Sequence, residues 1–116
     1  MITRDKEAII EDRENMRGGT GTVRLAHWFK QDDFKAKVRL CTRMTLAPGA
    51  SIGDHAHETD DEIYIVLSGH GRILEKGEWQ DIHPGDAILT GNGASHSVEN
   101  TGADPLVIAA VIILYN

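Results

Sequence analysis

Two histidines separated by a single residue are the first side chains here whose types and spacing suggest chemistry. His55 and His57 can point to the same side of a strand, because alternate residues of an extended chain share a face. Glu62 follows five residues later, and His96 comes after a glycine-rich turn, near the start of a later strand. Three imidazoles and one carboxylate form a plausible ligand set for Mn, Fe, Ni, Cu or Zn. Taken alone, the two neighbouring histidines are equally compatible with a pair of surface residues.

The segments that would position these side chains have the pattern of short strands. Apolar and polar residues alternate over 22–29 and 38–46, which is the period-two signature of a half-buried strand. Residues 63–67 form a short apolar run, and a hairpin is expected around Lys76-Gly77. Turns rich in glycine and proline separate these segments roughly every ten residues. The sequence therefore predicts an all-β sandwich or barrel without a long helix.

The chain length and the distribution of charge suggest one domain with an N-terminal extension. A chain of 116 residues is the size of one domain. The first 17 residues are highly charged and predict an arm or one short strand, and a glycine-rich turn follows up to residue 21. That turn lacks the strand and helix context of a phosphate-binding loop. We expect an arm over residues 1–21 and a barrel over residues 22–116.

Two motifs in the chain resemble those of the cupin superfamily. The first motif is a glycine, a His-x-His pair, a glutamate and a second glycine, and it matches here at Gly49, His55, His57, Glu62 and Gly69. The second motif ends in a histidine and an asparagine, and it matches at Gly85, Gly91, Gly93, His96 and Asn100. The one departure is Gly91, where the family usually has proline; both residues suit a turn. The two motifs cover residues 49–100.

The resemblance implies a fold and a ligand set. The fold is a double-stranded β-helix, the cupin or jelly-roll barrel, with one divalent metal ion in its mouth. The implied ligands are His55, His57, Glu62 and His96. Mn, Fe, Ni and Zn all suit such a set, because ligand type alone does not choose among them.

Four further residues are candidates for the pocket around the metal. Tyr64 and Val66 share the parity of Glu62 along their strand, so both are expected to point into the barrel near the ion. Met44 is expected in the pocket wall or the core. His27 lies on an apolar face and could support a metal ligand or line the pocket, with a core or interface position as the alternative.

Several functions fit such a site. Four protein ligands leave two positions open on a six-coordinate ion, which favours a metal-dependent enzyme of the lyase, isomerase or dioxygenase type. Its substrate would be a small oxygenated acid or a sugar-derived compound. The alternatives are a non-catalytic module that binds a metal and a small ligand, and a purely structural barrel.

The catalytic residues of such an enzyme are left unassigned, with Glu58, Asp60 and Asp61 as candidates for an acid or base. The overall resemblance is to small bacterial single-domain cupins, which are often labelled by analogy with oxalate decarboxylases or sugar isomerases. Oxalate decarboxylases carry an arginine three residues before the first histidine, and this chain has Ile52 there. Arg39 and Arg43, on the polar face of their strand, could anchor a substrate carboxylate, although solvated or interface positions are the alternative.

Composition excludes several kinds of partner and location. The net charge is −6 and no stripe of Lys and Arg is present, which argues against nucleic-acid binding. The longest apolar run, over residues 106–115, is too short to span a bilayer as a helix. A single cysteine, Cys41, and a charged N-terminus without a signal peptide favour the cytoplasm.

The same apolar run predicts a homodimer. Both faces of residues 106–115 are apolar, and so is the outer face of residues 63–67. An outer sheet face exposed to water should be polar, and the sequence offers no helix to cover it. A second subunit is therefore the expected cover, and the competing explanation is that the charged arm folds over its own sheet.

Overall fold

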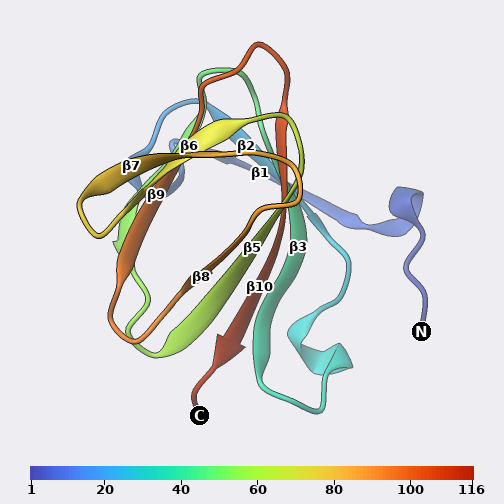
Figure 1. Ribbon diagram of the computed structural model, residues 1–116. Helices are drawn as coiled ribbons and strands as arrows, with labels where there is room; N and C mark the ends of the chain where they lie inside the picture. The colour runs from blue at the N-terminus through green and yellow to red at the C-terminus, as the bar shows by residue number, and fades with distance from the viewer.

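Ten strands and three single-turn 3₁₀ helices make up the computed structural model, which describes residues 1–116 (Figure 1). The strands are β1 (Ile9–Glu14), β2 (Thr22–His27), β3 (Val38–Leu46), β4 (Ser51–Ala56), β5 (Asp60–Ser68), β6 (Gly71–Glu75), β7 (Glu78–Ile82), β8 (Ala87–Thr90), β9 (Ser95–Asn100) and β10 (Leu106–Leu114). The 3₁₀ helices are η1 (Asp5–Glu7), η2 (Met16–Gly18) and η3 (Gln31–Asp33). None of the three has the length and apolar character needed to cross a bilayer.

The strands form two antiparallel sheets that enclose one core. One sheet has the order β1-β2-β3-β10-β5-β8, and the other has the order β4-β9-β6-β7. Alternate residues of both sheets point inward, as the period-two pattern requires. The buried core consists of Val23, Leu25, Met44, Leu46, Ala50, Ile52, Tyr64, Val66, Ile73, Ile82, Val98, Leu106, Ile108 and Ala110. The predicted all-β class is confirmed.

Local sequence accounts for the strand ends. The strand predicted over 38–46 is present as β3, and the predicted hairpin is present as β6 and β7. Lys76 and Gly77 both have positive φ, at 52° and 76°, as a two-residue turn with the right twist for a hairpin requires. The strand predicted over 22–29 ends earlier, at His27.

The N-terminal segment adds a strand to the larger sheet. Strand β1 pairs along its whole length with β2, from Ile9 opposite His27 to Glu14 opposite Thr22. After β1, the helix η2 lies against β4 of the smaller sheet, and the chain then returns to the larger sheet as β2. The arm expected over residues 1–21 thus contains an edge strand and a turn that contacts the opposite sheet.

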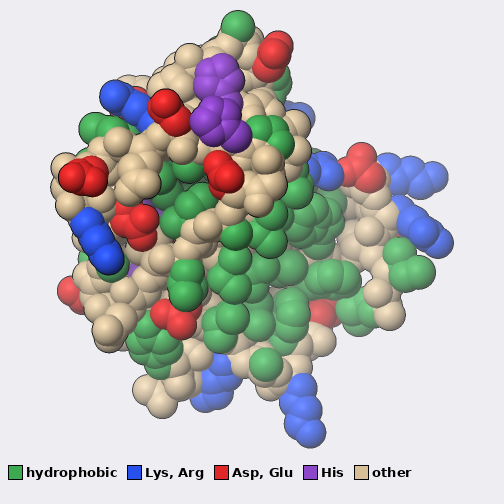
Figure 2. Space-filling model, in the orientation of Figure 1, with side chains coloured by type: hydrophobic (Ala, Val, Ile, Leu, Met, Phe, Trp, Pro, Cys, Tyr) green, Lys and Arg blue, Asp and Glu red, His purple; other side chains and the backbone are tan.

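The outer face of the larger sheet is apolar over β5 and β10. Ile65, Leu67 and Ile113 are each at least 40% exposed, and Leu89 on neighbouring β8 is 64% exposed. Figure 2 shows green side chains gathered across the middle of the molecule, in the region where Figure 1 draws these strands. Asp5 forms an ion pair with Arg43 on β3, but the N-terminal segment leaves these apolar side chains exposed. The homodimer therefore stays a prediction, with this face as the predicted interface.

We expect Ile65→Lys to dissociate that dimer, because a buried charge would replace an apolar side chain worth about 1.5–3 kcal/mol on burial. Sedimentation velocity at low micromolar concentration should show a dimer for the wild type and a monomer for the variant. Gln80→Lys places the same charge on exposed β7 of the other sheet and should leave the dimer intact. A monomeric wild type would refute the prediction.

Candidate metal centre

The four predicted ligands come from both sheets and meet between them. His55 lies in β4, His57 follows that strand, and His96 lies in β9, directly opposite His55 in the strand pairing. Glu62 projects toward them from β5 of the larger sheet. His57, Glu62 and His96 are at most 4% exposed, whereas His55 is partly exposed and forms the open side of the group.

The donor atoms of these residues converge. All four lie within 4.8 Å of one another. The Nε2 atom of His96 is 3.1 Å from the Nε2 atoms of both His55 and His57, and Glu62 Oε1 is 3.0 Å from His57 Nε2. Metal bonds of about 2.1 Å at right angles place neighbouring donors about 3 Å apart. The side chains present thus fit a single divalent ion.

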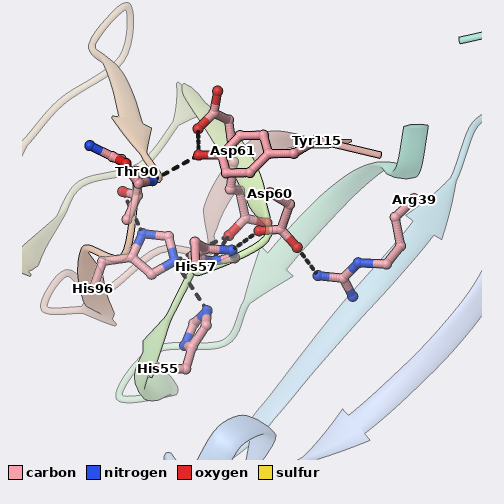
Figure 3. Close-up of polar contacts among 10 residues, drawn as sticks. Arg39, His55, His57, Asp60, Asp61, Thr90, His96 and Tyr115 are labelled. Atoms are coloured by element: carbon pink, nitrogen blue, oxygen red, sulfur yellow. Dashed lines mark hydrogen bonds and ion pairs between the residues drawn. The ribbon is translucent and has the colours of Figure 1, made fainter. Parts of the chain in front are cut away.

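A hydrogen bond at Nδ1 fixes the tautomer of two of the imidazoles, those of His55 and His57. His55 Nδ1 donates to the Gly53 carbonyl at 2.7 Å. His57 Nδ1 donates to the Asp60 carboxylate at 2.6 Å (Figure 3). Both partners can only accept, so each Nδ1 carries the hydrogen and each Nε2 keeps its lone pair. His96 Nδ1 lies 2.9 Å from the Thr90 hydroxyl. The rings are oriented as metal ligands require.

Electrostatics within the cluster favour one anion among three imidazoles. Burial alone would raise the pKa of Glu62, but its hydrogen bonds with His57 and His96 in the protonated, metal-free form of the cluster outweigh burial and hold that pKa at about 2. The Glu62 carboxylate in turn raises the pKa of His57, and desolvation lowers the pKa of His55. The cluster thus holds the negative charge of Glu62 next to the imidazoles.

Two further side chains hold the ligands in place. Asp60 is buried and bridges His57 to the guanidinium of Arg39, whose Nη2 lies 2.9 Å from Asp60 Oδ2 (Figure 3). Burial alone would raise the pKa of Asp60, but the bonds from His57 and Arg39 lower it. Tyr64 stacks on His96 with 4.8 Å between ring centroids. Asp60 is therefore charged in the fold and supports the ligand orientation.

The metal ligands open onto a small cavity of about 50 Å³. His55, His57, Glu62 and Tyr64 line one side of it. The other side is lined by Met16, Leu40, Ile112 and the arginines Arg13, Arg17 and Arg39. The volume is enough for about three or four water molecules, or for one small ligand. Three of the lining residues are arginines, and Glu62 is the one carboxylate among them.

The four residues predicted to line the pocket lie in three different places in the structure. Tyr64 lines the cavity, whereas Met44 and Val66 are buried in the core and are not among its lining residues. His27 lines a different, wider hollow of about 430 Å³, where its Nε2 lies 2.8 Å from Glu11. Arg13 and Arg39 stand between the two spaces and line both.

None of the acid/base candidates lines the cavity. Glu58 is exposed, and Asp60 is bound to His57 and Arg39. Asp61 accepts a hydrogen bond from the Tyr115 hydroxyl, which accepts one from the Asn92 backbone N–H (Figure 3). A side chain at Gly91 would collide with the Asp61 carboxylate. Glycine in place of the usual proline therefore makes room for this contact.

Sequence reasoning missed two of the cavity arginines and the supporting roles of three residues. Arg13 and Arg17 lie in the charged N-terminal segment, far in sequence from the motifs. Thr90 and the Gly53 carbonyl lie outside the motif positions, and Asp60 was considered only as an acid or base. One signal was available for Asp60: it follows His57 by three residues.

Comparison with known proteins places this geometry in a family. The Cupin_2 family, described as a cupin domain, matches residues 42–113. The chain is 45% identical over 114 residues to the oxalate-binding protein of Thermotoga maritima, covering 98% of this chain and 94% of that protein.

Two solved structures resemble this chain in fold. The crystal structure of a predicted oxalate decarboxylase from Thermotoga maritima matches with a TM-score of 0.94 at 45% identity, covering 98% of this chain and 99% of the other. KdgF from Halomonas sp. matches with a TM-score of 0.77 at 20% identity, covering 100% and 96% of the two chains, which shows the fold alone. The family match spans more than half of the chain and includes all four residues of the cluster, His55, His57, Glu62 and His96. On this evidence the chain belongs to the cupin family.

Proposed function

We propose that this protein binds a small dicarboxylic acid of the oxalate class at a divalent metal ion held by His55, His57, Glu62 and His96. The observation that carries the proposal is the cavity of about 50 Å³. Its lining includes three of the four metal-binding side chains, His55, His57 and Glu62, together with three arginines. A divalent ion in that position supplies a Lewis acid to which a carboxylate binds. The arginines supply the opposite charge for the rest of a small anion.

The absence of an oxalate-decarboxylase arginine at Ile52 does not weigh against an anion site. Ile52 is fully buried in the core and could not reach the cavity. Three arginines from other parts of the chain, Arg13, Arg17 and Arg39, are among the residues that line the cavity. The relative named oxalate-binding protein supports the same class of ligand.

The cavity favours binding over turnover. Decarboxylation of oxalate to formate needs a proton delivered to carbon, and such a proton comes from an acid within reach of the ligand. Glu62 is ionised and occupied as a ligand, and Asp60 and Asp61 are engaged with other side chains. The non-catalytic alternative is therefore the better supported one.

A metal-dependent enzyme acting on the same acid is the second candidate. The partly exposed side of the cluster at His55 favours it, because an ion bound there is reachable by ligand and water. Incubating metal-loaded protein with ¹³C-oxalate and following formate and CO₂ by NMR separates the two candidates.

The proposal is tested by calorimetry with oxalate on metal-loaded and metal-free protein. We expect oxalate to bind only the metal-loaded form and to bind more tightly than formate, because formate has one carboxylate and cannot engage the ion and the arginines together. Succinate, which is longer, serves as a size control and should bind more weakly. Equal binding of oxalate with and without metal would contradict the proposal.

Metal content should depend on the histidine cluster. We expect near-stoichiometric divalent metal in protein purified without chelator, because four converging donors bind one ion. His55→Ala and His96→Ala should lose most of it, as measured by elemental analysis. His83→Ala removes an exposed histidine and should have no effect. Folded wild-type protein that refuses added metal would refute the assignment.

Metal affinity should fall on acidification through the histidine range. The pKa of Glu62 is about 2, so this carboxylate stays ionised, and the protons that compete with metal bind the imidazoles. Glu62 raises the pKa of His57, which favours the protonated form that cannot bind metal, and we expect competition over the range around the ordinary imidazole pKa of about 6.5. Competition against a chromophoric chelator between pH 8 and pH 4 measures this. An affinity unchanged down to pH 4 would exclude ligation by histidine.

A further inference from the structure

The turn formed by η2 holds its central residue in an unfavourable conformation. Arg17 has φ 55° and ψ 30°, in the left-handed region, and Asn15 in the same turn has φ 51°. Glycine adopts such angles freely, whereas an arginine is held there only by the surrounding structure. Gly18 and Gly19 follow directly, so glycine is common in this turn, yet the position that lines the cavity carries a long cationic side chain.

Close backbone packing fixes this turn on the strand that carries His55. The Arg17 carbonyl lies so near Gly53 that a Cβ on Gly53 would collide with it. A Cβ on Gly19 would collide with the Ser51 carbonyl in the same strand. Ser51 N–H also donates to the Thr20 carbonyl at 2.8 Å. The turn is therefore seated directly against β4 beside the metal ligands.

Arg17 is also the one cavity arginine whose guanidinium has no partner. Arg13 is held by Glu11 and Arg39 by Asp60, at 3.0 Å and 2.9 Å. Arg17 forms no ion pair or side-chain hydrogen bond, although it is close enough to the buried Tyr64 for its charge to act on that side chain. Its five N–H donors are available for a carboxylate.

We propose that η2 is a preformed clamp in which Arg17 binds the carboxylate of the acid that points away from the metal, so that Arg17 selects diacids over monoacids. This rests on the proposed function. Arg13 and Arg39 form the charged wall of the cavity but remain occupied by their own carboxylates. The closely packed backbone of the turn fixes the position from which the exposed Arg17 side chain extends, so that binding has to order only that side chain.

The test compares Arg17→Gly with Asn15→Gly in metal-loaded protein. Both variants relieve a left-handed residue in the same turn, but only Arg17 lines the cavity. We expect both to keep full metal content and an unfolding midpoint at or above that of the wild type. Oxalate affinity should fall about tenfold or more in Arg17→Gly, as expected for loss of a charge-assisted pair, and stay unchanged in Asn15→Gly. Formate affinity should stay unchanged in both.

A further variant keeps the test decisive if the glycine disturbs the turn. Arg17→Gln keeps a polar side chain with a Cβ at the left-handed position but removes the charge and shortens the side chain, and it should lose oxalate affinity as Arg17→Gly does. Wild-type affinity for oxalate in both Arg17 variants would overturn the clamp and leave the proposed function standing. A metal-loaded wild type that does not bind oxalate would overturn the proposed function, and the clamp with it.

Discussion

The hydrogen bonds at the Nδ1 atoms of the histidine cluster are the constraint on which the site depends. A free imidazole can rotate and can carry its proton on either nitrogen. Here a backbone carbonyl fixes His55, a buried carboxylate fixes His57 and a hydroxyl lies against His96. With these rings held, the three Nε2 atoms face one point. The antiparallel pairing of β4 with β9 then sets His55 opposite His96, and β5 supplies the carboxylate from the opposite sheet.

The bond between His57 and Asp60 requires a further partner outside the cluster, because it buries the charge of Asp60. Asp60 orients His57 but brings a second buried negative charge close to Glu62, and an unpaired buried charge is strongly unfavourable. Arg39 compensates it from β3, with a side chain that is 42% exposed and also lines the cavity. The support of the ligands and the positive wall of the cavity are thus parts of the same chain of contacts.

The all-β fold and the convergence of four metal-binding side chains were predictable from the sequence because both depend on local patterns. Period-two alternation identified strands such as β3. The fixed spacing of residues in two motifs predicted that His55 and His96 lie in one site. The cavity wall was not predictable in the same way. Arg17 enters the site through a turn seated on another sheet, and no local pattern reports such a contact. His27, chosen from its apolar face, lies in a separate hollow because β1 adds an edge strand beside it.

Gly53 is a single residue on which two different properties depend. Its carbonyl orients His55, and the absence of its side chain admits the Arg17 turn. Any other residue at this position could keep the carbonyl, since all residues have one, but would displace the turn. During divergence, then, one substitution could change which anion such a barrel accepts while the metal ligands stay as they are. In this chain, the glycine two places before the first histidine of the motif is what lets the turn pack against β4.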